Sequence, residues 1–469
     1  MEGNARETVA RLLRDLRPKL PFPGKEKPAQ TLAERMMQCA TPGVSIAAID
    51  EFDVAWSSSF GKLAVGAIEE VTSRTPFQAG SISKPVFALA VMKLVEAGTL
   101  ALDTDVNTYL KSWRVPANDG WQPRVTLRQL LSHSAGTTVH GFPGYPPEGP
   151  FPPLSQILQG EPPSNTASVL VDVLPGTQFR YSGGGTTIAQ QAVADATGRP
   201  FADLMRELIL DPAGMKDSTF EQPLPPEKAA RAAKGHRWNG VPVQGGWHVY
   251  PEMAAAGLWT TASDLARLGS GVMRALRGDK PDLGLKQETV MEMLRPQLPD
   301  QKAGQDFSGL GWVCSGTDEE FRIAHGGWNE GFVAQLTLFP ALGKGAAVLL
   351  NSVQGWPLLD EIINAIGREF GFPASQRTPV ARTMLPGADY SGLYTNQEGI
   401  AFEVTQSSEG LAVKFEQQAP IPLVPASDDE FFATVLNLRV NFAKSGAGLP
   451  ASMTIQSGGK TINLTRKHE

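Results

Sequence analysis

Cysteine and histidine are scarce in this chain, and neither follows a metal-binding pattern. Of its 469 residues, two are cysteines, Cys39 and Cys314, and six are histidines without H-x-x-x-H spacing. Two cysteines allow one long-range disulfide but exclude a disulfide framework. Without paired Cys or His spacing, we expect no metal site. The sequence therefore predicts a protein that works without a metal or another cofactor.

Long apolar runs and excess positive charge are also missing. No segment approaches the roughly 18 consecutive apolar residues of a membrane span, and residues 1–14 are charged and amphipathic, unlike a secretory signal. A net charge of −6 and a pI near 5.7 give no electrostatic reason to bind nucleic acid or an anionic membrane. We expect a cytoplasmic protein with no membrane span, or a periplasmic or secreted one if a leader has been removed.

The most informative motif is Ser81-Ile82-Ser83-Lys84, which precedes a long apolar run. Residues three apart share one face of a helix, so Ser81 and Lys84 are expected to lie side by side. A serine beside an amine can be the nucleophile of acyl transfer without a Ser-His-Asp triad. The alternative is a plain helix cap followed by a surface lysine, which the apolar surroundings make less attractive.

The rest of the chain predicts two domains. Strands are expected at 43–50, 51–63, 321–325, 331–339 and 345–352, with helices at 85–97, 126–133, 185–210 and 358–370. Residues 138–168 are rich in proline, glycine and aromatics, which is typical of a lid or wall rather than a linker. A break near residues 373–379 precedes short strand-like runs. We predict one domain at 1–375 and a small antiparallel β-barrel at 385–469.

Five motifs in order give this chain a family resemblance. They begin at Gly80-Ser81, Leu130, Pro175, Ala256 and His325, and read GSISK, LLSHSAG, PGTQFRYSG, AGLWTTASDL and HGG. Over roughly residues 35–370 the chain resembles the serine β-lactamase and penicillin-binding-protein superfamily, most closely its class C β-lactamase-like esterases and D-aminopeptidases. The resemblance implies an α/β (α+β) transpeptidase fold: a helical lobe packed on an antiparallel sheet flanked by helices. The tail resembles the lipocalin-like barrel of some members.

The resemblance also implies four catalytic residues. Ser81 would form the acyl-enzyme, and Lys84 would act as general base or proton shuttle. Tyr181 would pass the serine proton to the leaving group. His325 stands where many relatives carry lysine, and it would polarise the Tyr181 phenol or, when protonated, bind a substrate carboxylate. His133, in contrast, is expected to fix a helix end.

Several further residues are expected around the substrate. The backbone N–H groups of Ser81 and Trp328 would form the oxyanion hole, and Gly326 and Gly327 would let the substrate backbone approach closely. Loop aromatics are expected to line the site, foremost Tyr145 and Trp247, with His140, His248 and Tyr250 also candidates.

One departure from the family pattern affects the activity expected. Gly183 stands where lactamases and peptidases carry an asparagine that holds the substrate amide. Without that anchor, esters are the better substrates. We therefore predict a metal-independent serine hydrolase, a carboxylesterase of the family VIII type. Alternatives are a D-amino-acid-directed peptidase or amidase, a peptide-cyclising acyl transferase, a weak β-lactamase, or a non-catalytic penicillin-binding protein. The partner is a small ester, amide or peptide, and the protein is a monomer or homodimer.

Overall fold

The structure is a computed structural model that falls into two compact units. One unit contains residues 9–16 and 30–373, and the other contains the barrel together with 17, 28 and 29. The residues described are 9–17, 28–279, 283–302, 304–373, 389–396, 399–407, 410–415, 420–425, 429–433, 438–444, 450–457 and 460–467. The predicted boundary between domains ending at 375 and beginning at 385 lies outside these residues and stays a prediction.

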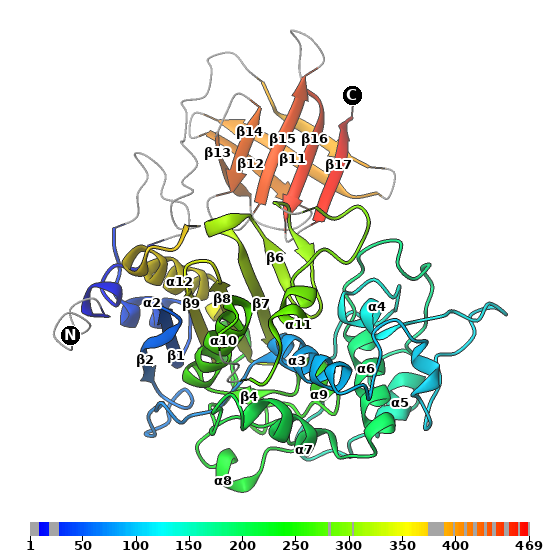
Figure 1. Cartoon of the computed structure of the whole chain (residues 1–469). Coiled ribbons are helices and arrows are strands. Elements are labelled where there is room, and N and C mark those ends of the chain that lie inside the picture. Colours follow the sequence, from blue (N-terminus) through cyan, green and yellow to red (C-terminus); the bar gives the residue numbers. More distant parts are fainter. Residues whose placement is uncertain are drawn as a thin grey trace. The chain divides into compact units, whose positions relative to one another are not determined.

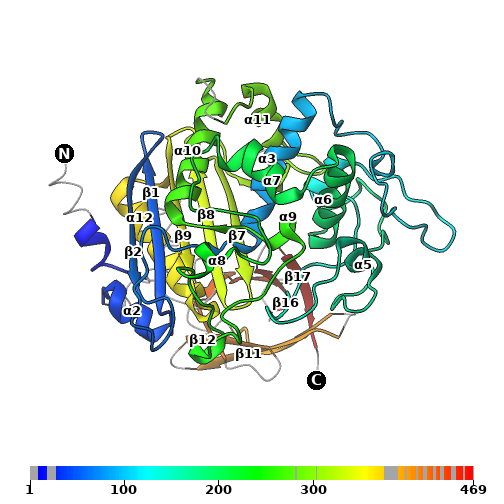
Figure 2. The same ribbon diagram turned by 90° about the horizontal axis from the view of Figure 1, so that it is seen from below.

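The first unit is built on a seven-stranded antiparallel sheet in the order β2-β1-β9-β8-β7-β6-β5. Figure 2 shows β1, β9, β8 and β7 side by side. The strands are β1 Gly43–Asp50, β2 Asp53–Gly61, β5 Phe307–Ser308, β6 Val313–Ser315, β7 Arg322–Asn329, β8 Phe332–Phe339 and β9 Lys344–Leu350. β3 Phe77–Gln78 pairs separately with β4 Trp259–Thr260. The expected strand at 321–325 continues to Asn329, so the HGG motif lies within β7.

Both faces of this sheet are covered, which explains the unbroken apolar sequence of β1. Ala47 and Ile49 belong to one hydrophobic core, whereas Val44, Ile46 and Ala48 belong to another. Successive strand residues point to opposite faces, so each face has its own core. Helix α10 Ala262–Arg277 packs on the first face, and α12 Trp356–Phe370 packs on the second.

The helical lobe follows β3 along the chain (Figure 1). Its central helix, α3 Ser83–Glu96, is buried on nearly all sides, as its apolar sequence predicts. The other helices of this unit are α2 Leu32–Gln38, α4 Leu127–Leu131, α5 Leu154–Gln159, α6 Gly183–Thr197, α7 Phe201–Met205, α8 Pro226–Ala229, α9 Met253–Ala256 and α11 Gln287–Met293. The proline-rich stretch 138–168 is therefore not wholly irregular, because α5 interrupts it. The expected helix at 185–210 begins earlier and is divided between α6 and α7, with a π-helical turn at Arg206–Leu210.

The second unit is a closed antiparallel β-barrel. Its strands follow chain order from β10 to β17, and β10 also pairs with β17 to close the barrel. They are β10 Gly392–Thr395, β11 Ala401–Ser407, β12 Gly410–Phe415, β13 Ile421–Pro425, β14 Glu430–Ala433, β15 Leu438–Lys444, β16 Pro450–Ser457 and β17 Lys460–Arg466. A core of aromatic and aliphatic side chains, including Tyr394, Phe431 and Phe442, fills it. The predicted α/β fold with a C-terminal barrel is confirmed.

The two cysteines do not form the disulfide that their number allowed. Cys39 and Cys314 are both buried free thiols. Burial raises the pKa of Cys39, and it raises that of Cys314 to about 12. Across the described residues, no helix has both the length and the apolar character needed to cross a membrane. Within those same residues, His, Cys, Asp and Glu side chains form no group of three that could hold a metal ion.

Candidate active site

The structure brings Lys84 and Tyr181 to the hydroxyl of Ser81. Lys84 Nζ donates to Ser81 Oγ at 3.0 Å, and Tyr181 OH donates to the same oxygen at 2.9 Å. Lys84 Nζ also donates to the Ala255 carbonyl at 2.8 Å and lies 5.0 Å from the centre of the Tyr181 ring. Lys84 is only 4% exposed, whereas Ser81 is half-buried. One reachable hydroxyl thus has two proton-handling groups, an arrangement suited to nucleophilic catalysis.

The turn that presents Ser81 depends on a glycine and a second serine. Ser81 lies in η1 Gly80–Ile82, a 3₁₀ turn that leads directly into α3. Gly80 has φ +51°, and a Cβ there would lie 2.6 Å from the backbone nitrogen of Trp328. Ser83 Oγ donates to the Gly80 carbonyl at 2.6 Å and accepts from Leu258 N–H at 3.0 Å. The polar residue inside the motif therefore fixes the turn, a role that the sequence analysis did not assign.

Tyr181 is held by His133, as the expected structural role of that histidine requires. His133 ends the α4 segment with φ +57°, and its carbonyl accepts from Arg180 N–H at 2.7 Å. Its Nδ1 accepts from Ser182 N–H at 3.2 Å, and its ring lies 4.3 Å from that of Tyr181. Burial, and then the charge of Lys84, lower the pKa of His133 well below its usual value. The neutral ring clamps the backbone on both sides of the phenol.

His325 lies next to Tyr181 but carries no positive charge near neutral pH. The ring centres of these two residues are 6.4 Å apart, and His325 Nδ1 lies 2.6 Å from the Gly326 carbonyl. Since a carbonyl only accepts, Nδ1 must carry the proton, which leaves Nε2 as an acceptor. Burial, and secondarily Lys84, lower the pKa of His325 to about 4. This favours the expected role toward the Tyr181 phenol over binding a substrate carboxylate.

The glycines of β7 make room for the chain's own backbone as much as for a substrate. A Cβ at Gly327 would lie 1.9 Å from the Ala79 carbonyl oxygen. This glycine therefore lets β7 approach η1, rather than only letting a substrate approach β7 as expected. Gly326 is less crowded, because the nearest atom to its Cβ position is Gln335 Oε1 at 3.1 Å. The side chain of Trp328 is 47% exposed.

The two loop aromatics expected to line the site are anchored by contacts within the fold. Tyr145 is 5% exposed, its strand-like backbone pairs with Val249, and its hydroxyl accepts from Asn165 N–H at 3.4 Å. The ring of Trp247 packs edge-on against Trp259, with centres 5.3 Å apart. These contacts hold both side chains within the fold and neither contact is to Ser81, so their expected place around the substrate stays a prediction.

The three remaining aromatic candidates differ in what they contact. His140 lies near Tyr181, with ring centres 4.9 Å apart. Tyr250 is buried, and its hydroxyl accepts from Glu330 N–H at 3.0 Å. His248 Nδ1 lies 2.8 Å from the carbonyl of Pro143. Of these three, His140 is the one with a ring contact to a predicted catalytic side chain.

The loop that carries His140 also lies against Gly183, the residue at the expected asparagine position. A Cβ at Gly183 would lie 3.0 Å from Phe142 Cε2 and 3.2 Å from the His140 carbonyl. Gly183 N–H also donates to that carbonyl at 3.0 Å, and Ser182 caps α6 by accepting from Gly185 N–H. A side chain at position 183 would therefore crowd the Phe142 ring and the His140 carbonyl.

Residues far along the chain hold the active-site elements in place. Asn329 Nδ2, at the end of β7, donates to Gln78 Oε1 at 2.9 Å and to the Ala256 carbonyl at 3.0 Å. This link joins β7 to β3 and α9, the helix whose Ala255 carbonyl accepts from Lys84. Their separation of 251 positions hides the Asn329–Gln78 pair from sequence patterns. The position of Asn329 directly after HGGW was the only sequence feature that could have suggested this structural role.

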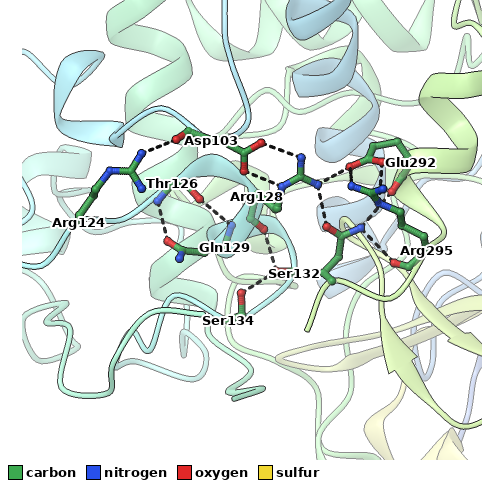
Figure 3. A network of polar contacts seen from close by, with 10 residues as sticks. Asp103, Arg124, Thr126, Arg128, Gln129, Ser132, Ser134, Glu292 and Arg295 are labelled. Atoms are coloured by element: carbon green, nitrogen blue, oxygen red, sulfur yellow. Dashed lines mark hydrogen bonds and ion pairs between the residues drawn. The ribbon is translucent and has the colours of Figure 1, made fainter. Parts of the chain in front are cut away.

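A charged network anchors α4, which leads to His133. Figure 3 shows Arg128 between Asp103 and Glu292. Arg128 Nε and Nη2 donate to the two carboxylate oxygens of Asp103 at 2.7 and 2.8 Å. Arg128 Nη1 forms an ion pair with Glu292 in α11. These pairs raise the pKa of Arg128 and lower that of Asp103. Ser132 and Ser134 share a hydrogen bond on either side of His133.

Comparisons with known proteins agree with this geometry. A family profile described as Beta-lactamase matches residues 29–365. The chain is similar to "Penicillin-binding protein 4*" of Bacillus subtilis (strain 168), 24% identical over 450 residues that cover 89% of this chain and 94% of that protein. It is 28% identical over 270 residues to "Esterase EstB" of Burkholderia gladioli, covering 51% of this chain and 65% of the esterase.

Solved structures share the fold. The octameric penicillin-binding protein homologue from Pyrococcus abyssi superposes with a TM-score of 0.61. It covers 92% of this chain and 98% of its own, at 22% sequence identity. The profile match spans most of the chain and includes every motif from GSISK to HGG. This chain therefore belongs to the Beta-lactamase family and is an enzyme of the serine β-lactamase-like hydrolase superfamily.

Proposed function

We propose that this enzyme hydrolyses carboxylic esters through an acyl-enzyme on Ser81. The observation that carries the proposal is the convergence of Lys84 Nζ and Tyr181 OH on Ser81 Oγ, at 3.0 and 2.9 Å. Substrate is a small-molecule ester, and no cofactor takes part. As in the sequence analysis, we assign the protein to the cytoplasm and to a monomer or homodimer. The Pyrococcus abyssi homologue is named octameric, so assembly size is a property to measure.

The reaction proceeds in two steps. Ser81 Oγ attacks the acyl carbon while its proton passes to the Lys84–Tyr181 pair, and the C–O bond of the ester breaks as that pair protonates the leaving alkoxide. A water molecule then attacks the acyl-enzyme, the same pair takes its proton, and Ser81 Oγ regains one. The N–H groups of Ser81 and Trp328 stabilise the oxyanion in both steps. Neutral His325 orients the Tyr181 ring beside it, because the single phenol proton is already donated to Ser81 Oγ.

Two observations favour esters over amides. Position 183 carries glycine instead of the asparagine that holds a substrate amide in lactamases and peptidases, and Phe142 lies against it. The relative from Burkholderia gladioli is named an esterase. A site without the amide anchor loses affinity for peptides and β-lactams but still attacks the more reactive ester carbonyl.

A second function is supported by the relative named Penicillin-binding protein 4*, which aligns over 94% of its length. In this alternative Ser81 attacks a β-lactam or a D-amino-acid peptide, and an amine rather than water can resolve the acyl-enzyme. A peptidase, amidase or cyclising transferase would result, or a weak β-lactamase if water succeeds. A protein that only binds penicillin is the least favoured case, because Lys84 and Tyr181 remain aimed at Ser81.

The test compares wild type with Ser81→Ala on p-nitrophenyl acetate, p-nitrophenyl butyrate and nitrocefin. Ser57→Ala, on the exposed side of β2, is the matched control. We expect ester turnover in wild type and Ser57→Ala, none above background in Ser81→Ala, and little nitrocefin turnover. Ester turnover that survives Ser81→Ala would refute the assignment. Fast nitrocefin turnover would favour the second function.

A further inference from the structure

Three half-exposed tryptophans form a cluster that includes Trp328, the residue after the HGG motif. We define the tryptophan surface as Trp238, Trp328 and Trp356, which are 59%, 47% and 42% exposed. The ring centres of Trp238 and Trp328 are 6.2 Å apart, and those of Trp328 and Trp356 are 5.7 Å apart. Isolated exposed apolar side chains are common, but three large rings in contact mark a surface that binds something.

The backbone of Trp328 lies against Gly80, the residue immediately before Ser81. The Cβ position of Gly80 lies 2.6 Å from Trp328 N and 2.9 Å from its carbonyl oxygen. The strand β7 that carries Trp328 therefore touches the residue immediately before the nucleophile. Trp328 N–H is also the proposed oxyanion donor, and the indole of the same residue lies on the side of β7 that Gly326 and Trp356 share.

The glycine at position 326 leaves the Trp356 end of the tryptophan surface uncovered. Its Cβ position lies 3.9 Å from Trp356 Cη2, the ordinary distance of a van der Waals contact. A larger side chain there would cover the Trp356 ring, which belongs to the first residue of α12. Gly326 thus connects the HGG motif to an open aromatic face.

The charges next to the surface are paired with each other. Arg237 precedes Trp238 and forms an ion pair with Glu330, two residues after Trp328. A guanidinium held by a carboxylate is not available to recognise an anionic substrate group. The surface therefore favours uncharged groups with apolar or aromatic faces.

We propose that the tryptophan surface binds an aromatic or alkyl group of the substrate whose ester is cleaved at Ser81. This inference rests on the proposed function and adds the substrate class. Contact with three indole faces removes apolar area from water, so affinity and turnover increase with the size of that group. The group belongs either to the acyl part or to the leaving alcohol, and the two sources are separated by experiment.

The test measures kcat/KM over two substrate series. In the acyl series p-nitrophenyl esters run from acetate to octanoate, and in the alcohol series acetates run from ethyl to benzyl. For each series we take the ratio of kcat/KM for the largest substrate to kcat/KM for the smallest. We expect Trp238→Ala and Trp356→Ala each to lower this ratio about tenfold in one of the two series. Trp121→Ala is the control, since Trp121 is 41% exposed in the Asn118–Trp121 turn and should leave both ratios unchanged.

A second measurement separates this inference from the proposed function. Methyl and octyl fluorophosphonates modify an activated serine without any turnover, and mass spectrometry counts the label on Ser81. We expect the octyl-to-methyl ratio of labelling rates to fall about tenfold in Trp356→Ala. If esters are not turned over but this labelling ratio falls, the proposed ester hydrolysis is refuted while the proposed binding by the tryptophan surface is supported.

Two results would overturn the inference. One is unchanged size ratios in both substrate series and in labelling, for Trp238→Ala and Trp356→Ala alike. The other is a change confined to self-association, seen as a shift in elution volume on size-exclusion chromatography, which would make the surface an interface between copies. Thermal unfolding of each variant checks that the fold is intact.

Discussion

Ser81 and Lys84 are held together by one turn of backbone, whereas Tyr181 reaches the same hydroxyl through contacts from across the lobe. The first pair needs only the η1–α3 turn and its glycine. Tyr181 depends on His133, which in turn follows a helix anchored by Arg128. The difference teaches that the nucleophile and its amine form a local unit, while the phenol is positioned by tertiary structure and is the easier part to disturb.

Breaking the local unit should have the largest effect. Lys84→Met removes a proton-handling group from Ser81 Oγ and should lower kcat/KM for p-nitrophenyl acetate by about 10³-fold, as expected for general acid–base catalysis. Lys93→Met is the control, because Lys93 belongs to the same helix but its Nζ donates to the Leu208 carbonyl at 2.7 Å. Steady-state kinetics of both variants measure the difference. Equal losses in the two variants would mean that Lys84 acts only through folding.

Breaking the support of Tyr181 should have a smaller effect on rate. His133→Ala leaves Ser182 N–H without its acceptor and frees the phenol, so kcat should fall about 30-fold with little change in KM. His133→Asn should recover most of the loss, because asparagine tolerates φ +57° and offers an acceptor oxygen. A kcat of His133→Ala equal to that of wild type would show that Tyr181 does not need this clamp.

One step further from the chemistry, Arg128 should affect stability more than catalysis. Arg128→Leu removes the pairs to Asp103 and Glu292 and should lower the free energy of unfolding by about 2 kcal/mol. The control is Arg199→Leu, whose partner Glu207 is more than half exposed at 60%. That surface pair should contribute less than about 0.5 kcal/mol. Urea unfolding of both variants gives the comparison, and similar losses would contradict it.

The smallest expected effect is a pH dependence of stability. The folded pKa of His325, about 4, lies below its unfolded value, so the unfolded chain binds a proton first as pH falls. Stability from this group is complete above about pH 6.5 and is lost as pH falls toward 4; between pH 7 and 5.5 the loss is about 1 kcal/mol. His325→Gln should flatten this slope in unfolding midpoints measured across that range. An unchanged slope would assign the titration to another residue.

The same contrast governs what the sequence could predict. Ser81 and Lys84 were found from spacing alone, and the sheet, helices and barrel followed from apolar patterns and turns. Tyr181 and His325 needed the resemblance, since no local pattern shows that residues 100 and more positions away meet.

What sequence analysis missed lies in packing between distant segments. Tyr145 and Trp247 were expected in the site because they are aromatic and in loops, whereas the burial of Tyr145 and the edge-on packing of Trp247 could not be read from the sequence. The glycine at position 183 was noticed, whereas the closeness of Phe142 to it is a tertiary contact. Gly327 was likewise expected to make room for the substrate, because the sequence does not show that Ala79 lies next to it.

The buried thiols have a practical consequence for spectroscopy. Cys39 and Cys314 are both hidden, and the raised pKa of each leaves little thiolate to react at neutral pH. A maleimide dye should therefore react only slowly with this chain. A single cysteine placed at position 241, which is exposed and joined through its backbone to Trp238, becomes a unique attachment point for a fluorophore. The fluorophore would report in real time when the neighbouring indoles bind or release a ligand.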